Sequence, residues 1–433
     1  MKQVVSAQPR KRFFVEMFTR DISLGNCILD LIDNSIDGFI RSNNVDLGKN
    51  LLRNLIHNET KKQKAAKIVI TISRNSVVVK DTCGGIPLDL AINEVFTFGH
   101  SEDSYKKAHS ASLGVYGVGL KRAIFKIGRH FIVESKSPDE GFRVEQDLNE
   151  WIKNDSDISD WSFPLEDLPS AAPNQSSGTK ITISKLNDDV KHIIEDDSFQ
   201  NRLRSDIAKV YALFLTKYVS IELNGAEIEP EFALLGESEQ VEQALQRFEV
   251  DGVEVTIMAS LASRSEAGSW SQEKAGWYIS CNGRLVLTAD KSSTSGWGTG
   301  QLPSFQPKFR GFIGYVFFVS DSPLKLPWTT TKRDLNQESQ LFSKVKNEMR
   351  VIARPIIAFL NSMYQKEAPE NPEERKIADT VKSVDLRTAY SRGTQSFEVK
   401  KGKRTKPTTV SVQYKAEKAD INLIKKDIGR QSI

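Results

Sequence analysis

Residues 26–40, NCILDLIDNSIDGFI, decide how the chain is interpreted, because they combine an apolar helical stripe with a narrow polar face. Successive side chains of an α-helix are about 100° apart around its axis. At that spacing, four polar side chains share an arc of roughly 100°: Asp30, Asp33, Asn34 and Asp37. The rest of the circumference is mainly apolar, so the pattern predicts a helix that packs one side against a core.

Three carboxylates on one arc repel each other unless a cation or hydrogen-bond donors lie among them. Asn34 adds a neutral oxygen, and a hard cation such as Mg²⁺ takes oxygen ligands while it keeps water and substrate phosphates around it. The helix is therefore consistent with the lining of a metal–nucleotide pocket. A solvated helix face is the alternative, and taken alone the stretch favours it.

The composition is that of an ordinary globular protein, with 433 residues, of which 39% are hydrophobic and 27% charged. This length accommodates two or three domains. No apolar run reaches the ~18 residues of a membrane helix, and the first residues lack the apolar core of a secretory signal. We therefore expect a cytoplasmic protein without a membrane partner. Three scattered cysteines and five histidines indicate neither a disulfide framework nor a dedicated metal cage.

The charge is concentrated at the C-terminal end. In residues 386–433, 12 Lys and Arg face 4 Asp and Glu, a balance of +8, whereas the preceding residues carry about −4. Residues 399–407, VKKGKRTKP, place five basic side chains within seven positions. A basic tail can contact phosphates, and a solvated terminus is an equally good explanation.

The order of the expected elements indicates two α+β domains and an appendage. Strand patterns occur at 67–80, 131–135, 142–146, 178–186 and 277–290, and the first and last of these predict hairpins, with Arg74-Asn75 and Asn282-Gly283 at their turns. Helical spacing occurs at 13–40, 197–215 and 338–364. The acidic stretch 150–178 predicts a surface loop. We expect the domains to span 1–215 and 216–365, followed by a basic tail at 366–433.

A second candidate element is DTCGGIP at 81–87, directly after a strand pattern. An Asp at a strand end can accept a hydrogen bond from the exocyclic amine of adenine, whereas guanine presents a carbonyl that a carboxylate repels. Gly84 and Gly85 would let the backbone pass close to a base. An ordinary Asp-Gly turn is the alternative, and in isolation it is the simpler one.

A third element is GVYGVGLKRAIFKIG at 114–128, in which glycines lead into a helix expected to begin near Leu120. Backbone N–H groups at a helix N-terminus form a phosphate site, and Lys121 adds charge. The order G-x-x-G-x-G differs from the dinucleotide fingerprint, and no P-loop pattern occurs in the chain. Further on, Thr179 opens a strand, and LPWTTTKRDL at 326–335 places Lys332 and Arg333 in a loop. A cation there could reach a γ-phosphate, with surface solvation as the alternative.

Taken in order, these elements resemble the GHKL ATPases, the superfamily of DNA gyrase, 90-kDa heat-shock chaperones, histidine kinases and MutL mismatch-repair proteins. DLIDNSIDG from Asp30 is similar to their E-x-x-x-N-x-x-D-A motif, DTCGG to D-x-G-x-G, GVYGVGLK to the glycine-rich lid, and GTKITI to the G-T strand. FGHSEDS followed by LGVYGVGLK looks most like the MORC branch. The resemblance covers about residues 13–185. The later β-rich pattern with Lys332 resembles the transducer domain of gyrase, MutL and MORC.

The resemblance implies an α+β fold, with a Bergerat-fold ATPase sandwich followed by a transducer-like α+β domain, and binding of ATP with Mg²⁺. Asn34 would ligate Mg²⁺, Asp81 would bind adenine N6, and Thr179 would support that contact through water. Asp30 would be the general base and Lys332 the contact to the γ-phosphate. The other expected nucleotide-binding residues are Asp37, Gly85, Ile86, Gly114, Tyr116, Gly117, Val118, Gly119, Leu120 and Lys121.

Two departures from the family pattern matter. Asp30 stands where the family has Glu, and a base shorter by one methylene implies slow hydrolysis. Cys83 replaces the first glycine of D-x-G-x-G, which leaves the backbone conformation of that loop open. The resemblance further implies an ATP-gated homodimeric clamp, for which nucleic acid is the expected cargo. A non-hydrolysing scaffold or chaperone-like protein that acts on protein partners is the alternative.

Overall fold

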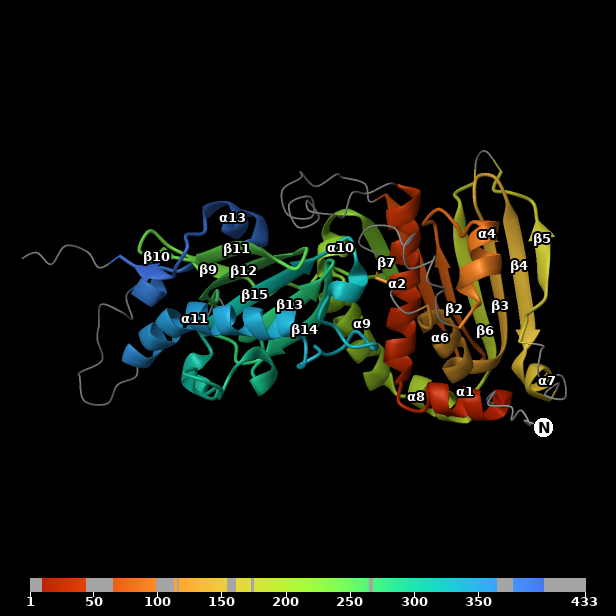
Figure 1. Cartoon of the computed structure of the whole chain (residues 1–433), viewed down its shortest axis with the longest axis horizontal. Coiled ribbons are helices and arrows are strands. Elements are labelled where there is room, and N and C mark those ends of the chain that lie inside the picture. The colour runs from red at the N-terminus through yellow and green to blue at the C-terminus, as the bar shows by residue number, and fades with distance from the viewer. Residues whose placement is uncertain are drawn as a thin grey trace, which may run out of the picture.

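The structure, a computed structural model of the chain, describes residues 10–43, 65–98, 113–114, 117–153, 161–172, 175–264, 268–363 and 377–400. Within these ranges the chain forms two halves, each built around a mixed β-sheet (Figure 1). Helix α2 stands where the two halves meet (Figure 1). The expected α+β class is therefore confirmed, with one mixed sheet in the first half and another in the second half.

The first half contains a sheet of eight strands. Their order is β5 (Leu165–Leu168), β4 (Gly141–Asp147), β3 (Gly128–Lys136), β6 (Gly178–Leu186), β2 (Ser76–Asp81), β1 (Ala66–Ile72), β7 (Val219–Leu223) and β8 (Ala226–Glu227). Neighbouring strands are antiparallel except β1 and β7, which are parallel. Strand β1 alternates buried and exposed side chains, as its β-branched pattern predicts. The hairpin expected at 67–80 is confirmed by the β1–β2 pairing.

The first half also contains helices. They are α1 (Lys11–Thr19), α2 (Leu24–Ser42), α4 (Leu88–Leu90), the π-helix η1 (Ala91–Val95), α6 (Gly119–Ile127), α7 (Leu148–Lys153), α8 (Asp188–Ile194), α9 (Asp197–Val210) and α10 (Ala212–Lys217). The Ser23 side chain caps α2 by accepting a hydrogen bond from the Asn26 amide. The apolar side of α2 is fully buried at Ile28, Leu31 and Ile32. Each such side chain contributes about 1.5–3 kcal/mol to stability.

Two sequence expectations for the first half need correction. The stretch expected as a loop at 150–178 contains the end of α7 and strand β5, a polar edge strand that pairs with β4. Its composition gave no sign of this, because an edge strand with two exposed carboxylates carries no apolar pattern. Strands β7 and β8 lie beyond the boundary expected at residue 215, yet they extend the first sheet.

The second half has a five-stranded sheet in the order β11 (Ala244–Val250), β12 (Val253–Leu261), β15 (Phe312–Val319), β13 (Gly276–Cys281) and β14 (Arg284–Asp290). Strands β13 and β15 are parallel. The β13–β14 hairpin is confirmed, and its turn residues Asn282 and Gly283 both have positive φ, 47° and 84°. The long helix α11 (Gln340–Ser362) and the 3₁₀-helices η2 (Ser293–Ser295), η3 (Pro307–Phe309) and η4 (Pro323–Lys325) complete this half.

Residues 377–400 are part of the second half rather than of a free tail. Strand β16 (Lys382–Val384) pairs with β9 (Leu235–Glu237), and β17 (Glu398–Val399) pairs with β10 (Val241–Glu242). Between them, α13 (Leu386–Arg392) places the Tyr390 ring 3.8 Å from the Arg247 guanidinium. The expected tail beginning at residue 366 is corrected accordingly. Most of its basic cluster, beyond residue 400, lies outside the described residues.

In the described part of the chain, no helix combines the length and the hydropathy needed to cross a membrane. All three cysteines are buried and free.

Candidate nucleotide-binding site

The polar side chains of α2 contact two different parts of the molecule, the segment 113–122 and the second half. Arg122 Nη2 donates to Asp30 Oδ2 at 2.9 Å, and the amides of residues 113 and 114 donate to the two Asp37 oxygens at 2.6 Å each. Asp33 instead contacts Arg284 and Lys332, which belong to the second half. The four side chains therefore do not line one pocket together. Asp30 and Asp37 contact the glycine-rich segment and the start of α6, whereas Asp33 contacts the second half.

Asp81 closes the end of β2 and is held by three donors. Its Oδ1 accepts from the amides of Cys83 (2.9 Å) and Thr179 (3.1 Å), and its Oδ2 accepts from Ser35 Oγ (2.8 Å). Burial raises the pKa of Asp81, although these hydrogen bonds act in the opposite direction. Thr179 thus supports Asp81 directly through its backbone, while its hydroxyl bonds Ser135 Oγ at 3.0 Å. Among the described residues Oδ2 accepts only the Ser35 bond, so it can accept a second one from an outside donor such as an exocyclic amine.

The loop after Asp81 brings backbone close to this carboxylate. Gly84 and Gly85 have φ of 94° and 73°, whereas Cys83 does not adopt the left-handed region. Cysteine in place of the family's first glycine therefore needs no strained conformation here. A Cβ at Gly85 would collide with the Lys136 carbonyl, and the Ile86 amide donates to Ser135 Oγ at 2.8 Å. This packing fixes the loop against β3.

The glycine-rich segment meets α2 at the start of α6. Gly117 has φ of 60°, Val118 occupies the N-cap position, and Gly119 begins the helix. A Cβ at Gly119 would lie 3.4 Å from the Asp30 Cβ, so the first turn of α6 lies directly against Asp30. Leu120 is buried in the core. The first amides of a helix lack intrahelical partners, which suits them to an anion. Tyr116 lies outside the described residues.

Asp37 connects the same segment to α2. Both its oxygens accept backbone hydrogen bonds, from Leu113 and from Gly114. Burial raises the pKa of Asp37 to about 6, even though these two bonds favour the ionised form. Asp37 therefore holds the residues before the glycine-rich turn, and in the described residues it does not bind another side chain by a hydrogen bond.

Lys121 is almost completely buried, and its ammonium is occupied by protein groups. Its Nζ donates to the carbonyls of Val95 (2.8 Å) and Thr97 (2.6 Å) at the end of the 88–98 segment. Burial lowers the pKa of Lys121 to about 7. A phosphate contact by Lys121 would require at least one of these bonds to break.

Asp30 is buried and forms an ion pair with Arg122. Arg122 lies in the first turn of α6, just after the glycine-rich turn. No other hydrogen bond to this carboxylate comes from the described residues. Arg122 therefore fixes the direction of the carboxylate through Oδ2.

Asp33 is the centre of a buried charge cluster. Its Oδ1 accepts from Tyr211 Oη (2.7 Å) and Arg284 Nε (2.9 Å), and its Oδ2 accepts from Lys332 Nζ (2.7 Å). Burial alone would raise the pKa of Asp33, but Arg284 and Lys332 outweigh it and hold that pKa below its ordinary value. Arg284 Nη1 also donates to the Lys332 carbonyl at 2.6 Å. The cluster joins the two halves of the molecule.

The region around Asp30 suits an anionic ligand, because buried donors close to it lack hydrogen-bond partners among the described residues. Asn34 Nδ2, Arg122 Nε and Arg333 Nη2 are buried without a hydrogen-bond partner among the described residues. Arg333 lies close enough to Asp30 for that carboxylate to affect its pKa, which burial lowers. Unpaired buried donors cost about 1–3 kcal/mol each, which a bound phosphate would recover. Turning the Asn34 amide would present its oxygen to Mg²⁺ instead.

In the described part of the chain, no cluster of three or more His, Cys, Asp or Glu could hold a metal by itself. A Mg²⁺ ion here would therefore depend on Asn34, water and the phosphates of a nucleotide.

The first half thus combines a mixed sheet, helices and the glycine-led helix α6, which is the α+β arrangement expected for an ATPase of this class. Residues 22–179 match the family described as histidine kinase-, DNA gyrase B-, and HSP90-like ATPase, and this part of the chain is a GHKL-type ATPase domain. Such a domain implies ATP binding and hydrolysis, and GHKL ATPases bind Mg-ATP. A comparison with curated proteins gave no match.

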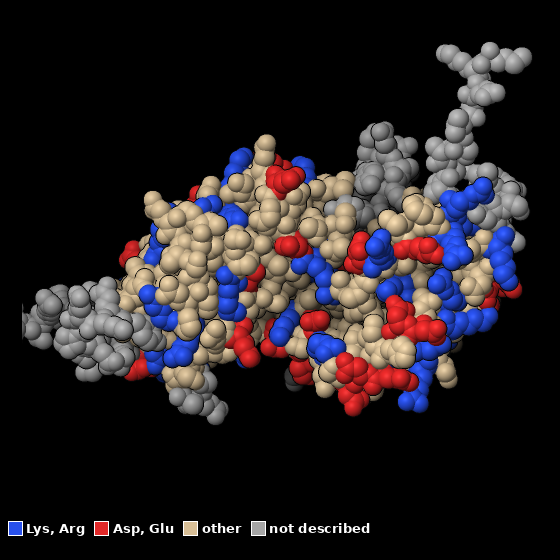
Figure 2. Space-filling model, turned by 90° about the horizontal axis from the view of Figure 1, so that it is seen from below, with Lys and Arg blue, Asp and Glu red and all other residues tan. Residues whose placement is uncertain are grey.

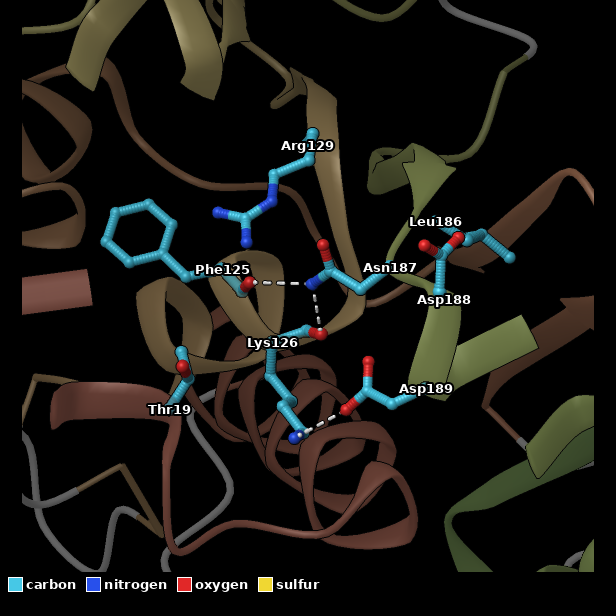
Figure 3. Close-up of a pocket in the computed structure, with 8 residues that line it drawn as sticks. All are labelled: Thr19, Phe125, Lys126, Arg129, Leu186, Asn187, Asp188 and Asp189. Atoms are coloured by element: carbon cyan, nitrogen blue, oxygen red, sulfur yellow. Dashed lines mark hydrogen bonds and ion pairs between the residues drawn. The ribbon is translucent and has the colours of Figure 1, made fainter. Parts of the chain in front are cut away.

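A separate open cavity of about 530 Å³ lies at the opposite end of α6 (Figure 3). Lys126 Nζ is paired with Asp189 there, and Asn187 Nδ2 donates to the Lys126 carbonyl (Figure 3). These groups cap α6 and satisfy one another. The cavity is distinct from the candidate site, which lies at the N-terminal end of the same helix.

Sequence reasoning missed four residues of the site. Ser35 and Arg122 directly follow motif residues, and their positions could have suggested them. Tyr211 and Arg284 carry no local signal, because they are 178 and 251 residues away from Asp33 in the chain.

Proposed function

We propose that the protein is a Mg-ATP-dependent ATPase in which the nucleotide lies over α2, between Asp81 and the start of α6. The observation that carries this proposal is the buried Asn34 Nδ2 atom, which has no hydrogen-bond partner among the described residues and lies one turn from Asp30 on the same helix. Ser35 on the next position binds Asp81, which provides an acceptor for adenine N6. The family match covers residues 22–179, which include these side chains, and so supports an ATP site in this half.

Each residue would then have a distinct task. Asp81, fixed by Ser35 and two amides, orients the base. The N-terminal amides of α6 and Lys121 hold phosphate oxygens. Asp30 accepts a proton from the attacking water, with Arg122 keeping its carboxylate in position. Asn34 would hold Mg²⁺, which when bound supplies charge neutralisation of the phosphates. Lys332 contacts the γ-phosphate from the second half.

The finer part of the proposal is an ATP-gated homodimeric clamp that holds nucleic acid. Support comes from the resemblance to MORC, MutL and gyrase and from the +8 charge balance of residues 386–433. The face in Figure 2 intersperses Lys and Arg with Asp and Glu over both halves. This face therefore offers no broad surface of one sign, and the basic C-terminal segment is the main candidate for phosphate contacts.

A single assay tests the enzymatic part: ATP turnover by the full chain with Mg²⁺, with and without duplex DNA. Asp30→Asn keeps the shape of the side chain but removes the base, so we expect turnover to fall by about 10²–10⁴-fold. The exposed Asp21→Asn is the matched control and should leave turnover unchanged. Equal turnover by Asp30→Asn and wild type would contradict the assignment of the base. Turnover indifferent to DNA, without salt-sensitive DNA binding, would remove nucleic acid as the cargo.

The second candidate is an ATP-gated scaffold for protein partners that does not hydrolyse ATP. The ion pair between Asp30 and Arg122 favours it, because the shortened carboxylate already has a partner at 2.9 Å. In this case ATP binds to the wild type without turnover under any condition. Asp30→Glu, which restores the methylene, distinguishes the two candidates: faster hydrolysis indicates an enzyme limited by its short base.

A further inference from the structure

We propose that Asp33 holds the Lys332 ammonium when no γ-phosphate is present, and thereby sets how strongly the site prefers a nucleoside triphosphate to a diphosphate. This inference rests on the proposed function, because it assumes that Lys332 contacts the γ-phosphate. It assigns to Asp33 a positioning role toward the nucleotide, beyond its place in the charge cluster that joins the two halves.

The two oxygens of Asp33 have different partners. Oδ1 accepts from Tyr211 and Arg284, whereas Oδ2 accepts from Lys332 alone within the described residues. The side chains of Asp33, Arg284 and Lys332 are 0%, 1% and 8% exposed, so water does not compete for these bonds. Loss of Lys332 would therefore leave Asp33 still paired with one cation and one hydroxyl. A buried charge left without any partner would be far more costly.

The main chain of Lys332 is fixed independently of its ammonium. Its carbonyl accepts from Arg284 Nη1, and its amide donates to the Thr329 carbonyl at 2.9 Å. The loop is closed by the bridge between Trp328 and Leu335. Lys332 has φ of 54°, a left-handed conformation that a lysine adopts only where its surroundings impose it. The side chain can thus move from Asp33 while the loop stays in place.

Two observations support a path for the released Lys332 ammonium to the candidate site. Lys332 is close enough to Asp37 to affect the pKa of that carboxyl, and Asp37 binds the residues before the glycine-rich turn. Asp33 also directly precedes Asn34 on α2. A γ-phosphate carries more negative charge than a carboxylate and can compete for the ammonium. A diphosphate lacks that group, so Lys332 would stay on Asp33.

The test is the affinity of the full chain for Mg-ATP and Mg-ADP, measured by isothermal titration calorimetry for four proteins: wild type, Asp33→Asn, Lys332→Met and the double variant. Asp33→Asn weakens the competing partner, so we expect the ATP-to-ADP affinity ratio to rise by about fivefold or more. Lys332→Met should reduce the ratio. In the Lys332→Met background, Asp33→Asn should have no further effect on it.

Tyr211→Phe should change the ATP-to-ADP affinity ratio in the opposite direction, and it keeps the aromatic ring in the core. It removes one donor from Asp33 Oδ1, which strengthens the remaining hold on Lys332, so the affinity ratio should fall. This variant also serves if Asp33→Asn does not fold, as judged by circular dichroism. A ratio that is unchanged or raised in Tyr211→Phe would overturn the inference, as would an effect of Asp33→Asn that persists without Lys332.

The outcomes separate the inference from the function on which it rests. No Mg-ATP binding by the wild type would refute the proposed function. Binding with a ratio that Lys332→Met leaves unchanged would refute Lys332 as the γ-phosphate contact. A ratio that depends on Lys332 but not on Asp33 or Tyr211 would refute only the present inference.

Discussion

At the scale of single residues, the site contains charges whose present partners differ from those proposed for the nucleotide-bound protein. Lys121 binds two carbonyls, Asp30 binds Arg122, and Lys332 binds Asp33. In each case a phosphate or water would have to replace a protein group. These three side chains are therefore the positions at which nucleotide binding should produce a measurable exchange of partners.

The lowered pKa of Lys121 leads to a prediction about proton uptake when ATP binds. Burial lowers its pKa to about 7, so the amine is largely neutral at pH 8. A nearby triphosphate favours the charged form and raises that pKa, so binding of ATP at pH 8 should take up protons. Calorimetry in buffers of different ionisation enthalpy measures this uptake. Lys121→Met should lack it, whereas Lys126→Met, on the same helix but paired with Asp189, should retain it. Equal uptake by wild type and Lys121→Met would contradict a phosphate contact.

At the scale of elements, the loop after β2 depends on backbone conformation more than on side chains. Gly85 combines a positive φ of 73° with close packing on the Lys136 carbonyl. Its own carbonyl accepts from Arg41 Nη2 at 2.9 Å, which connects the loop to the last turn of α2. A change at this position should therefore affect both the stability of the domain and the setting of Asp81.

We expect Gly85→Ala to lower the free energy of unfolding by about 1–3 kcal/mol or more, because alanine is strained at this φ and its Cβ has no space. Gly25→Ala is the matched control, since this helical glycine of α2 has no atom within 4 Å of an added Cβ. That control should be neutral or stabilising by up to about 1 kcal/mol. Denaturant unfolding measures both, and equal stabilities of the two variants would contradict the packing described for the loop.

Several helices and hairpins could be predicted from the sequence, because local residue patterns determine them. The α2 helix, the β1–β2 hairpin and the β13–β14 hairpin follow from periodicity and turn residues. Strand β5 and the place of β7 in the first sheet could not be predicted, since edge pairing and sheet membership depend on distant partners. The same distinction applies to the site. Motif residues were found, whereas Arg284 and Tyr211 were missed because they reach Asp33 only through the fold.

At the scale of the whole molecule, α2 is part of both halves at once. Its apolar side packs in the first half, while Asp33 binds Arg284 and Lys332 of the second half. Asn34, the next residue, belongs to the candidate nucleotide site. A ligand that contacts Asn34 and attracts Lys332 would change the charge cluster between the halves, which is how we expect ATP to affect their arrangement.

The most direct test of this account is calorimetric titration of the full chain with ATP and Mg²⁺, for wild type and Asn34→Ala. We predict that the wild type binds Mg-ATP and that Asn34→Ala binds it about 10–100-fold more weakly, because a buried polar contact to a charged ligand is lost. Removal of Mg²⁺ should weaken the wild type far more than the variant. Full Mg-ATP affinity in Asn34→Ala would contradict the assignment of the site to α2.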